Sequence, residues 1–394
     1  MKVSLKDILK LKSKNIPLVW LSIFFSGMIF FLPIIALYLQ KSLFTLTNVS
    51  ILFAVGTITS ALLQVPTGAF ADIYGRKKSM FISLAFLLFA IFFLYIGKNM
   101  FLLVIYVILN SLSKSFFAGA DSSLIYDTLK KEKKESYFKK VNGTGQAIWP
   151  LGASIGGIIG GYIAAYSLDL TVILSLIPVS IALITVLFIK EPQLNRKAKK
   201  RMRSQMWESA KFVLNNKQIL LILFGMFILF GLGEGIHFLT SVFFQFKNIP
   251  IVAFGYLSAV SFALSALGHY YSHELSEKFG NKRTILISIC FSIILIAFST
   301  LVFGYIAAFA YILGSVFFGI RNPVLGHLVN IETPSNKRAT VASISVLLID
   351  GGIAIFAPIV GWLAQTYTIN TSYMISSLAM VLALILFAFI KDKK

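Results

Sequence analysis

Twelve long apolar stretches are the feature that most constrains what this chain can fold into. A helix needs about 20 apolar residues to cross a hydrocarbon core of about 30 Å. Only 13% of the 394 residues are charged, whereas 57% are hydrophobic, so the apolar surface needs lipid to cover it. We predict an all-α membrane protein with twelve transmembrane helices, at roughly 17–40, 46–70, 79–97, 99–126, 140–166, 169–189, 218–243, 249–273, 283–303, 305–329, 337–367 and 370–390.

The net charge of +21 follows the predicted topology and does not indicate a nucleic-acid partner. If the N-terminus is cytoplasmic, 32 of the 36 lysines and arginines fall on the cytoplasmic side, and the opposite side holds only Lys41, Lys98 and Lys247. This asymmetry follows the positive-inside rule. We therefore expect a multi-pass protein of the bacterial cytoplasmic membrane with both termini in the cytoplasm.

The basic start of the chain resembles a signal peptide, but the apolar run that follows is too long and lacks a small-residue cleavage site. We therefore expect it to remain as helix 1. The single cysteine, Cys290, falls in helix 9 and cannot form an intrachain disulfide.

The longest polar segment separates six predicted helices from six others. It begins at Glu191-Pro192, which ends helix 6, and it is rich in lysine and arginine. Apolar residues from Met206 to Leu214 recur at helical spacing, so the segment is either an amphipathic helix on the anionic inner leaflet or a solvated linker. We predict an N-terminal six-helix bundle over 1–190, a basic linker over 191–217 and a C-terminal six-helix bundle over 218–394.

Three pairs of short patterns favour an internal duplication of the two halves. In each pair the second pattern follows the first by between 201 and 207 residues. The pairs are Asp72 to Lys78 with Glu277 to Arg283, Lys114 with Arg321, and Gly156-Gly157-x-x-Gly160 with Ala357-Pro358-x-x-Gly361.

The loop after helix 2 carries the most specific motif in the chain. Gly68, Asp72, Gly75, Arg76 and Lys77 stand in the pattern G-x-x-x-D-x-x-G-R-[KR]. Glycines permit close helix approach and a tight turn, and an aspartate can cap a helix N-terminus. In this loop the sequence resembles the major facilitator superfamily.

That resemblance implies a fold and a role for the loop. The fold is two pseudo-symmetric six-helix bundles around a central cavity, which alternate between inward-facing and outward-facing states. The loop acts in that family as a conformational latch, in which the aspartate meets helix 11 and the arginine meets an acid at the end of helix 4. Asp127 matches the position of that acid.

Helix 5 carries a second resemblance, to the drug:proton antiporters of the same superfamily. Its glycines follow the antiporter pattern G-x8-G-x3-G-P-x2-G-G, with Gly157 in place of the proline, and they could equally serve helix packing alone. The stripe consists of Gly143, Gly152, Gly156, Gly157, Gly160 and Gly161.

Two acids within the predicted spans are candidates for carrying a proton. Glu234 lies in helix 7 with His237 one turn further on, and Asp350 lies at mid-depth in helix 11. Charged groups inside a membrane are costly and mark function by default. A carboxyl group shielded from water keeps its proton to a higher pH, and an imidazole titrates near neutrality. Each acid could instead be a structural partner of a buried cation.

Other charged residues in the spans leave several pairings open. Lys114 and Asp121 are seven residues apart, which would place them on one face of a continuous helix 4. Lys114 or Arg321 could neutralise an anionic substrate or pair with one of the acids. His269 and His273 are only a weak metal signal, so we predict no metal site and favour residues at the membrane interface.

The sequence also excludes several function classes. It contains no G-x-x-x-x-G-K-[ST] loop and no soluble domain, so we predict no cofactor and no enzyme activity, and transport must draw on a gradient. We expect a monomeric secondary transporter that exports small amphipathic molecules in exchange for protons, with many of its 37 Phe and 15 Tyr lining an adaptable cavity. The alternatives are transport of a specific metabolite, peptide or lipid, or a receptor or pore.

Overall fold

The computed structural model describes residues 13–43, 45–192, 211–335 and 337–391 of the chain, and its regular structure there is helical. Twelve segments among these residues are long and apolar enough to cross a membrane, which confirms the predicted number. By their internal contacts the described residues form two compact units. Unit 1 draws on Met1–Tyr38 and Thr59–Ala198, and unit 2 on Leu39–Ile58 and Lys199–Lys394, so the division passes through two helices, Ile35–Leu43 and Leu46–Tyr74.

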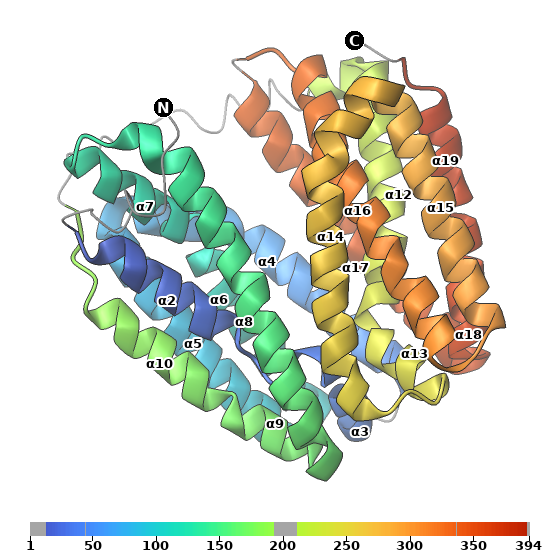
Figure 1. Cartoon of the computed structure of the whole chain (residues 1–394), viewed down its shortest axis with the longest axis horizontal. Coiled ribbons are helices and arrows are strands. Elements are labelled where there is room, and N and C mark those ends of the chain that lie inside the picture. The colour runs from blue at the N-terminus through green and yellow to red at the C-terminus, as the bar shows by residue number, and fades with distance from the viewer. Residues whose placement is uncertain (1–12, 44, 193–210, 336, 392–394) are drawn as a thin grey trace. The chain divides into compact units, whose positions relative to one another are not determined.

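The first six spans are built from helices that are often shorter than the span itself (Figure 1). In chain order they are α2 (Asn15–Gly27), η1 (Leu32–Ile34), α3 (Ile35–Leu43), α4 (Leu46–Tyr74), α5 (Arg76–Ile96), α6 (Met100–Phe117), α7 (Ala120–Lys131), η2 (Glu135–Tyr137), α8 (Phe138–Tyr166), α9 (Leu168–Leu174) and α10 (Leu176–Leu187).

The last six spans contain five unbroken helices of 21 to 29 residues, α12 and α14 to α17, and they run alongside one another in unit 2 (Figure 1). The elements are α12 (Lys217–Phe238), α13 (Thr240–Phe246), α14 (Ile251–Phe279), α15 (Asn281–Leu301), α16 (Gly304–Glu332), α17 (Arg338–Thr366), α18 (Ile369–Ala379) and α19 (Val381–Ala388).

Short polar residues set where several helices begin. The side-chain oxygen of Asn99 accepts the amide of Leu102 at the start of α6, at 3.0 Å. Asn216 accepts two amides at the start of α12, at 3.0 and 3.2 Å, and the Thr368 hydroxyl accepts the Thr371 amide at the start of α18, at 3.0 Å. These side chains satisfy amides that have no partner within the helix itself.

Two glycines turn the chain at matching places in the two halves. Gly75 separates α4 from α5 with φ of 110°, and Gly280 separates α14 from α15 with φ of 84°. Side chains with a Cβ rarely adopt such angles. The two turns lie 205 residues apart and coincide with the first of the repeated patterns in the sequence.

Several spans contain an interruption, and the expectation that Lys114 and Asp121 share one face of a continuous helix 4 was wrong. The first span breaks between Gly27 and Leu32, and the fourth breaks at Ala118 and Gly119. Gly119 has φ of 74°, a left-handed conformation that an α-helix cannot contain. The sixth and twelfth spans likewise divide at Ser175 and Met380.

Three helix pairs within the units meet backbone to backbone. α8 packs on α2 and the residues that follow it, α17 packs on α12, and α16 packs on α14. A Cβ added at Gly160 of α8 would lie 1.8 Å from the carbonyl oxygen of Phe30, and one at Gly352 of α17 would lie 2.2 Å from that of Phe227. Only glycine permits approaches as close as these, which we call glycine seams.

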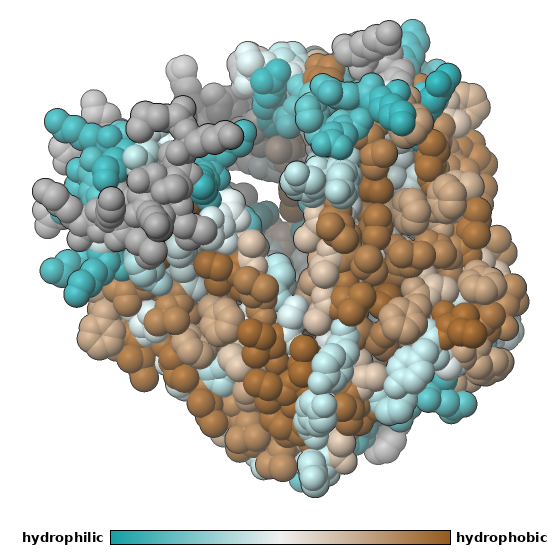
Figure 2. Space-filling model, viewed as in Figure 1, coloured by the Kyte–Doolittle hydropathy of each residue, from teal (hydrophilic) through white to brown (hydrophobic). Residues whose placement is uncertain are grey.

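Hydrophobic side chains cover the flanks of the helices, as a protein in lipid requires. Figure 2 shows this over α14 to α16 of unit 2, with hydrophilic residues gathered at the end where α14 and α15 meet. Lys278, Lys282 and Arg283 belong to that end, in agreement with the predicted basic loop. Most of the predicted amphipathic helix of the linker lies outside the described residues, although 211–215 are helical.

Candidate functional site

Glu234 is the best-supported candidate of the C-terminal half. It lies near the end of α12 and is half-buried. Its charge acts on both Arg321 and Tyr311, which stand about three turns apart on α16. The structure therefore brings together two of the charged residues that the sequence singled out, although 87 positions separate them in the chain.

Arg321 is a buried cation, with 7% of its surface exposed. Its Nη1 donates a hydrogen bond of 2.8 Å to the Ser292 hydroxyl of α15, and its guanidinium lies 5.5 Å from the ring centre of Phe318. Among the described residues no acceptor contacts its Nε. A buried guanidinium retains its charge and is stabilised by a counter-charge, and the charge of Glu234 acts in this direction.

Asp350 and His237 occupy different surroundings. Asp350 lies in α17 and is half-buried, and no hydrogen bond or ion pair to its carboxylate is found within the described part of the chain. His237 lies in the last turn of α12 with an exposed side chain. A half-buried carboxylate without a fixed partner is free to bind a proton or a cation.

A cluster of rings and hydroxyls surrounds the end of α12. Tyr373 of α18 stacks on Phe243 of α13 with ring centres 4.4 Å apart, and its hydroxyl donates to the Ile236 carbonyl at 2.8 Å. The Thr240 hydroxyl lies 2.7 Å from the His237 carbonyl and 2.8 Å from the Tyr311 hydroxyl. This cluster had no sequence signal beyond an abundance of aromatic residues.

Lys114 and Asp121 lie on opposite sides of the break in span 4. Lys114 is in the last turn of α6, and Asp121 is in the first turn of α7, where its carboxylate bonds to its own backbone and to that of Ser122. Because the chain turns at Gly119, helical spacing does not place the two side chains on one face. The reasoning that paired them from sequence therefore fails, and each remains a separate candidate.

The motif loop after α4 is held by residues of unit 1. Asp72 and Arg76 form an ion pair at 2.5 Å, and Gly75 makes the turn between them. Lys77 reaches the Leu187 carbonyl at the end of α10, at 2.7 Å. Lysine at a helix C-terminus satisfies a free carbonyl and complements the helix dipole.

Glu191 is a residue of this loop that sequence reasoning missed. Its carboxylate accepts the backbone amides of Arg76 at 2.9 Å and Lys77 at 2.7 Å, so it caps the N-terminus of α5. Asp72, for which a capping role was expected, pairs with Arg76 instead. The available signal was an acid placed within the most basic segment of the chain.

Asp127 lines a cavity of about 300 Å³ beside the motif loop. Arg76, the predicted latch partner of Asp127, borders the same cavity. The remaining lining residues are Ser122, Ser123, Tyr126 and Phe138. The two predicted partners thus face one polar space within unit 1.

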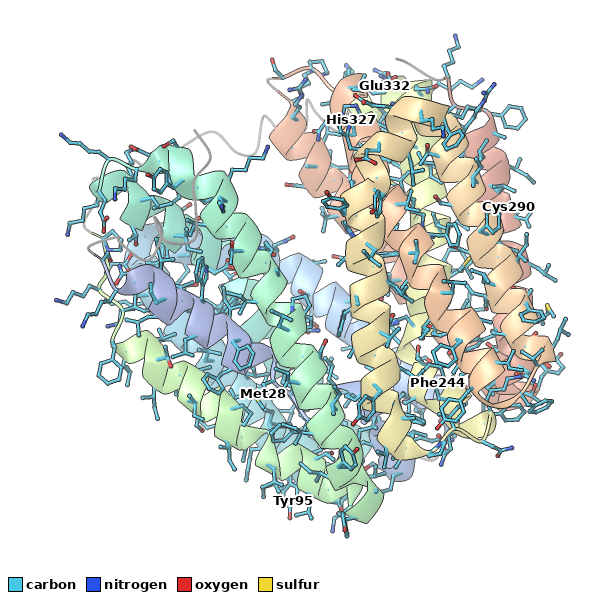
Figure 3. The ribbon with its side chains drawn as sticks, viewed as in Figure 1. Met28, Tyr95, Phe244, Cys290, His327 and Glu332 are labelled. Carbon is cyan, nitrogen blue, oxygen red and sulfur yellow. The ribbon has the colours of Figure 1, made fainter. Side chains whose placement is uncertain are left out.

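The glycine stripe of α8 faces α2 and the break that follows it. Added Cβ atoms at Gly152 and Gly156 would lie 2.1 Å from the Phe24 carbonyl oxygen and 2.8 Å from the Met28 carbonyl carbon. Met28 lies where the two helices approach in Figure 3. Gly143 differs, because nothing lies within 4 Å of its added Cβ. Gly157 and Gly161 are buried in the same helix.

A buried serine holds the break in the first span. The Ser175 hydroxyl, at the break in the sixth span, accepts the Phe30 amide at 2.9 Å and donates to the Thr171 carbonyl at 2.7 Å. Tyr373 plays a comparable part for α12, as described above. In both halves, a helix that is itself divided supplies a side chain to the backbone of another divided span.

The histidines of α14 and α16 do not converge on a metal. His269 bonds to the Ser265 carbonyl at 2.9 Å, and His273 lies 3.5 Å from Glu277 on the exposed surface. His327 lies near Glu332 at one end of unit 2, whereas Phe244 lies at the other (Figure 3). Within the described ranges, no three His, Cys, Asp or Glu side chains form a metal-binding group.

Lys247, between α13 and α14, is fully buried, with 0% exposure. Its ammonium donates to the carbonyls of Thr300 at 2.9 Å and Val302 at 2.8 Å, and it lies 4.6 Å from the ring centre of Phe303. Burial lowers the pKa of Lys247 from its ordinary value because it disfavours the charged form. The lysine fastens the α13–α14 turn to the turn between α15 and α16.

Comparison with known proteins identifies the fold and family. The structure is similar to a variant of the nucleoside transporter NupG, with a TM-score of 0.81 and 14% identity over 96% of this chain and 99% of that one. It is also similar to a bacterial homologue of the human lysosomal transporter Spinster, with a TM-score of 0.70 and 14% identity over 95% of this chain and 93% of the other. These identities establish the fold alone.

Comparisons of the amino-acid sequence with known proteins identify a relative and a family. The uncharacterized MFS-type transporter MJ1560 of Methanocaldococcus jannaschii is 22% identical over 389 residues, which cover 93% of this chain and 95% of the relative. The family model described as Major Facilitator Superfamily matches residues 19–357, which is most of the chain. The chain therefore belongs to the Major Facilitator Superfamily of transporters.

Proposed function

We propose that this chain is a proton-coupled secondary transporter that exports small amphipathic molecules. The observation that carries the proposal is the half-buried carboxylate of Glu234, whose charge acts on the buried guanidinium of Arg321. Ionisable groups inside membrane spans mark ion pathways and proton relays. Membership of the transporter superfamily supports transport as the activity.

Protonation of Glu234 is the step that would couple the gradient to the conformation. The deprotonated carboxylate attracts Arg321 across α12 and α16, and an added proton removes that attraction. Interactions of this kind are stronger in a membrane interior than in water. The proton therefore changes how strongly two helices of the same unit hold each other, in a fold that works by rocking its bundles.

Asp350 is the second acid in this proposal. Because no fixed partner to it is found among the described residues, it is available to a cationic group of the substrate or to a second proton. Lys114, Asp121 and His237 remain candidates of lower rank. Export is supported by the glycine stripe of α8, which resembles the antiporter pattern apart from Gly157.

Proteoliposomes loaded with a pH-sensitive dye and given an acidic interior test the proposal. Wild-type protein should move a lipophilic cationic dye with counterflow of protons, and Glu234→Gln and Asp350→Asn should abolish the coupling. Glu277→Gln is the matched control, because this acid is exposed at the end of α14. Normal coupling in both site variants would refute the assignment of the proton site.

A specific solute is the alternative substrate, and one comparison favours nucleosides as its first test. The fold is similar to that of a nucleoside transporter, with a TM-score of 0.81. Transport assays with a panel of nucleosides in the same liposomes distinguish an exporter of amphipathic molecules from a transporter of a specific solute. Gradient-dependent nucleoside uptake without movement of any dye would replace the exporter by a metabolite transporter.

We also infer that both termini face the cytoplasm of the bacterial cell. The asymmetric distribution of lysine and arginine supports this orientation. Fluorescent-protein and alkaline-phosphatase fusions to the C-terminus report the side directly. Phosphatase activity together with absent fluorescence would place the C-terminus outside.

A further inference from the structure

The end of α12, one turn beyond Glu234, is attached to two neighbouring helices by hydroxyl groups. Tyr373 of α18 donates to the Ile236 carbonyl at 2.8 Å. On the other side the Thr240 hydroxyl bridges the His237 carbonyl, at 2.7 Å, and the Tyr311 hydroxyl of α16, at 2.8 Å. The mechanism proposed above assigns no role to Tyr311 or Thr240.

Counting protons fixes the direction of the hydroxyl chain. The His237 carbonyl can only accept, so the Thr240 hydroxyl must give it its single proton. Tyr311 must therefore donate to the Thr240 oxygen. The chain runs from Tyr311 through Thr240 to the backbone of α12, and loss of either hydroxyl breaks it.

The ring of Tyr311 is held in place by its neighbours. Its centre lies 5.8 Å from that of Phe243, 5.9 Å from that of Phe244 and 5.8 Å from that of Tyr373. Tyr311 is thus packed against α13 and α18 while it stands on α16, the helix that also carries Arg321. The hydroxyl chain joins the helix of the acid to the helix of its counter-charge.

We propose that Tyr311 is a positioning residue for Glu234, which fixes the separation of the Glu234 carboxylate from Arg321 through the hydroxyl of Thr240. The inference rests on the proposed function, because it concerns how the proton-carrying acid is set. The distance between the Glu234 carboxylate and the Arg321 guanidinium governs how tightly the carboxylate holds its proton. A carboxylate that moves away from a cation keeps its proton to a higher pH.

Other ionisable groups lie on the elements packed against α12, and a change in any of them would also move a titration. Glu234 acts electrostatically on Tyr311 and Arg321 of α16. On α12 itself there are Lys217 and His237, and α13 and α19 carry none. The rest are Tyr305, His327 and Glu332 on α16, Arg338 and Asp350 on α17, and Tyr373 on α18.

An infrared titration of the purified protein tests the inference without a substrate. The carboxyl band that is present in wild type and missing in Glu234→Gln reports the protonation of Glu234. Tyr311→Phe should move its midpoint to higher pH. The expected shift is a few tenths of a pH unit, about 2- to 3-fold in proton affinity, which is the change that a small loosening of a charge pair produces.

Three further variants separate positioning from general damage. Thr240→Val should shift the midpoint as Tyr311→Phe does, and the double variant should shift it no further, because the two hydroxyls act in series. Thr240→Ser keeps the hydroxyl and should restore the wild-type midpoint. Tyr305→Phe is the matched control, since Tyr305 is an exposed tyrosine at the start of the same helix α16, and it should leave the midpoint unchanged.

The outcomes distinguish the inference from the function on which it rests. A Glu234 band with the same midpoint in wild type and Tyr311→Phe overturns the inference and leaves the proposed function standing. Equal shifts in Tyr311→Phe and Tyr305→Phe also overturn it, because they indicate a general loosening. If Glu234→Gln removes no band, Glu234 does not titrate, and both the proton-site assignment and the inference fail.

Discussion

Replacement of Gly160 by alanine tests whether the seam between α8 and the first span depends on backbone contact. The new Cβ would lie 1.8 Å from the Phe30 carbonyl oxygen, whereas ordinary contact begins at 3.4 Å. A carbonyl oxygen cannot swing aside like a side chain, so the two backbones must part by more than an ångström. Overpacking of this kind costs about 1–3 kcal/mol.

Gly143 provides the control in the same helix. Alanine is favoured over glycine in a helix by up to about 1 kcal/mol, and nothing lies within 4 Å of a Cβ at Gly143. Gly143→Ala should therefore keep or raise the melting temperature. Gly160→Ala gains the same propensity but meets the clash, so the difference between the two variants isolates the cost of the contact.

The assay is thermal unfolding of the detergent-purified protein, followed by intrinsic tryptophan fluorescence. A cost of about 1–3 kcal/mol in a unit of this size lowers the melting temperature by about 2–12 °C. Gly160→Ala should melt lower than Gly143→Ala by an amount in this range. Equal melting temperatures, or a higher value for Gly160→Ala, would refute the seam as a backbone contact.

Three further changes test other contacts. Glu191→Gln weakens two charge-assisted hydrogen bonds to the start of α5 and should lower the free energy of unfolding by about 1–3 kcal/mol, measured by thermal melting. Ser175→Ala leaves the buried Phe30 amide without its acceptor and should cost about 1–3 kcal/mol, with faster hydrogen exchange at Phe30. Lys247 has a lowered pKa in the folded protein. The free energy of unfolding should therefore rise with pH just below the ordinary lysine pKa of 10.5. Lys247→Met should lose this pH dependence.

The sign for Lys247 follows from proton binding in the two states. At pH values between the lowered and the ordinary pKa, the unfolded chain binds the proton and the folded protein does not, so stability rises with pH there. Below the lowered pKa both states are protonated, and the cost of burial is fully present. A slope that is the same in Lys247→Met would contradict this account.

Exposed residues of the same types supply the controls. Glu135→Gln, Ser136→Ala and Lys98→Met should change melting or its pH slope little, since substitutions at open positions usually fall within about 0.5 kcal/mol. Melting of Glu191→Gln indistinguishable from that of Glu135→Gln would remove the capping role. Unchanged exchange at Phe30 in Ser175→Ala would remove the support of the first break.

The spans were predictable because lipid imposes a length and a composition on every crossing segment. The interruptions within the spans were harder to predict. Gly119 marks the break in the fourth span, and Pro178 follows the break at Ser175 by three residues, but no glycine or proline lies within three residues of Met380. The break in the first span is held by the hydroxyl of Ser175, which is distant in the chain, and no local sequence pattern reports such a contact.

The charged residues of the candidate site could be predicted individually, but their arrangement could not. Glu234, Arg321 and Asp350 were found because each charge inside a span is costly and stands out. Their arrangement was not predictable, since the separation of Glu234 from Arg321 in the chain carries no information on distance. Glu191 was missed because a cap formed between distant segments has no spacing rule.

The glycine seams also bear on how easily helices within each unit can slip. Packed side chains lock the register of two helices, since a knob must leave one hole before it enters the next. Backbone surfaces lined by Gly152, Gly156 and Gly160 offer no knobs, and the same holds at Gly352 in the other half. Small shifts of one helix along the axis of the other require no change of side-chain rotamer at these seams. Lateral separation of the two helices, in contrast, exposes the packed backbone surfaces.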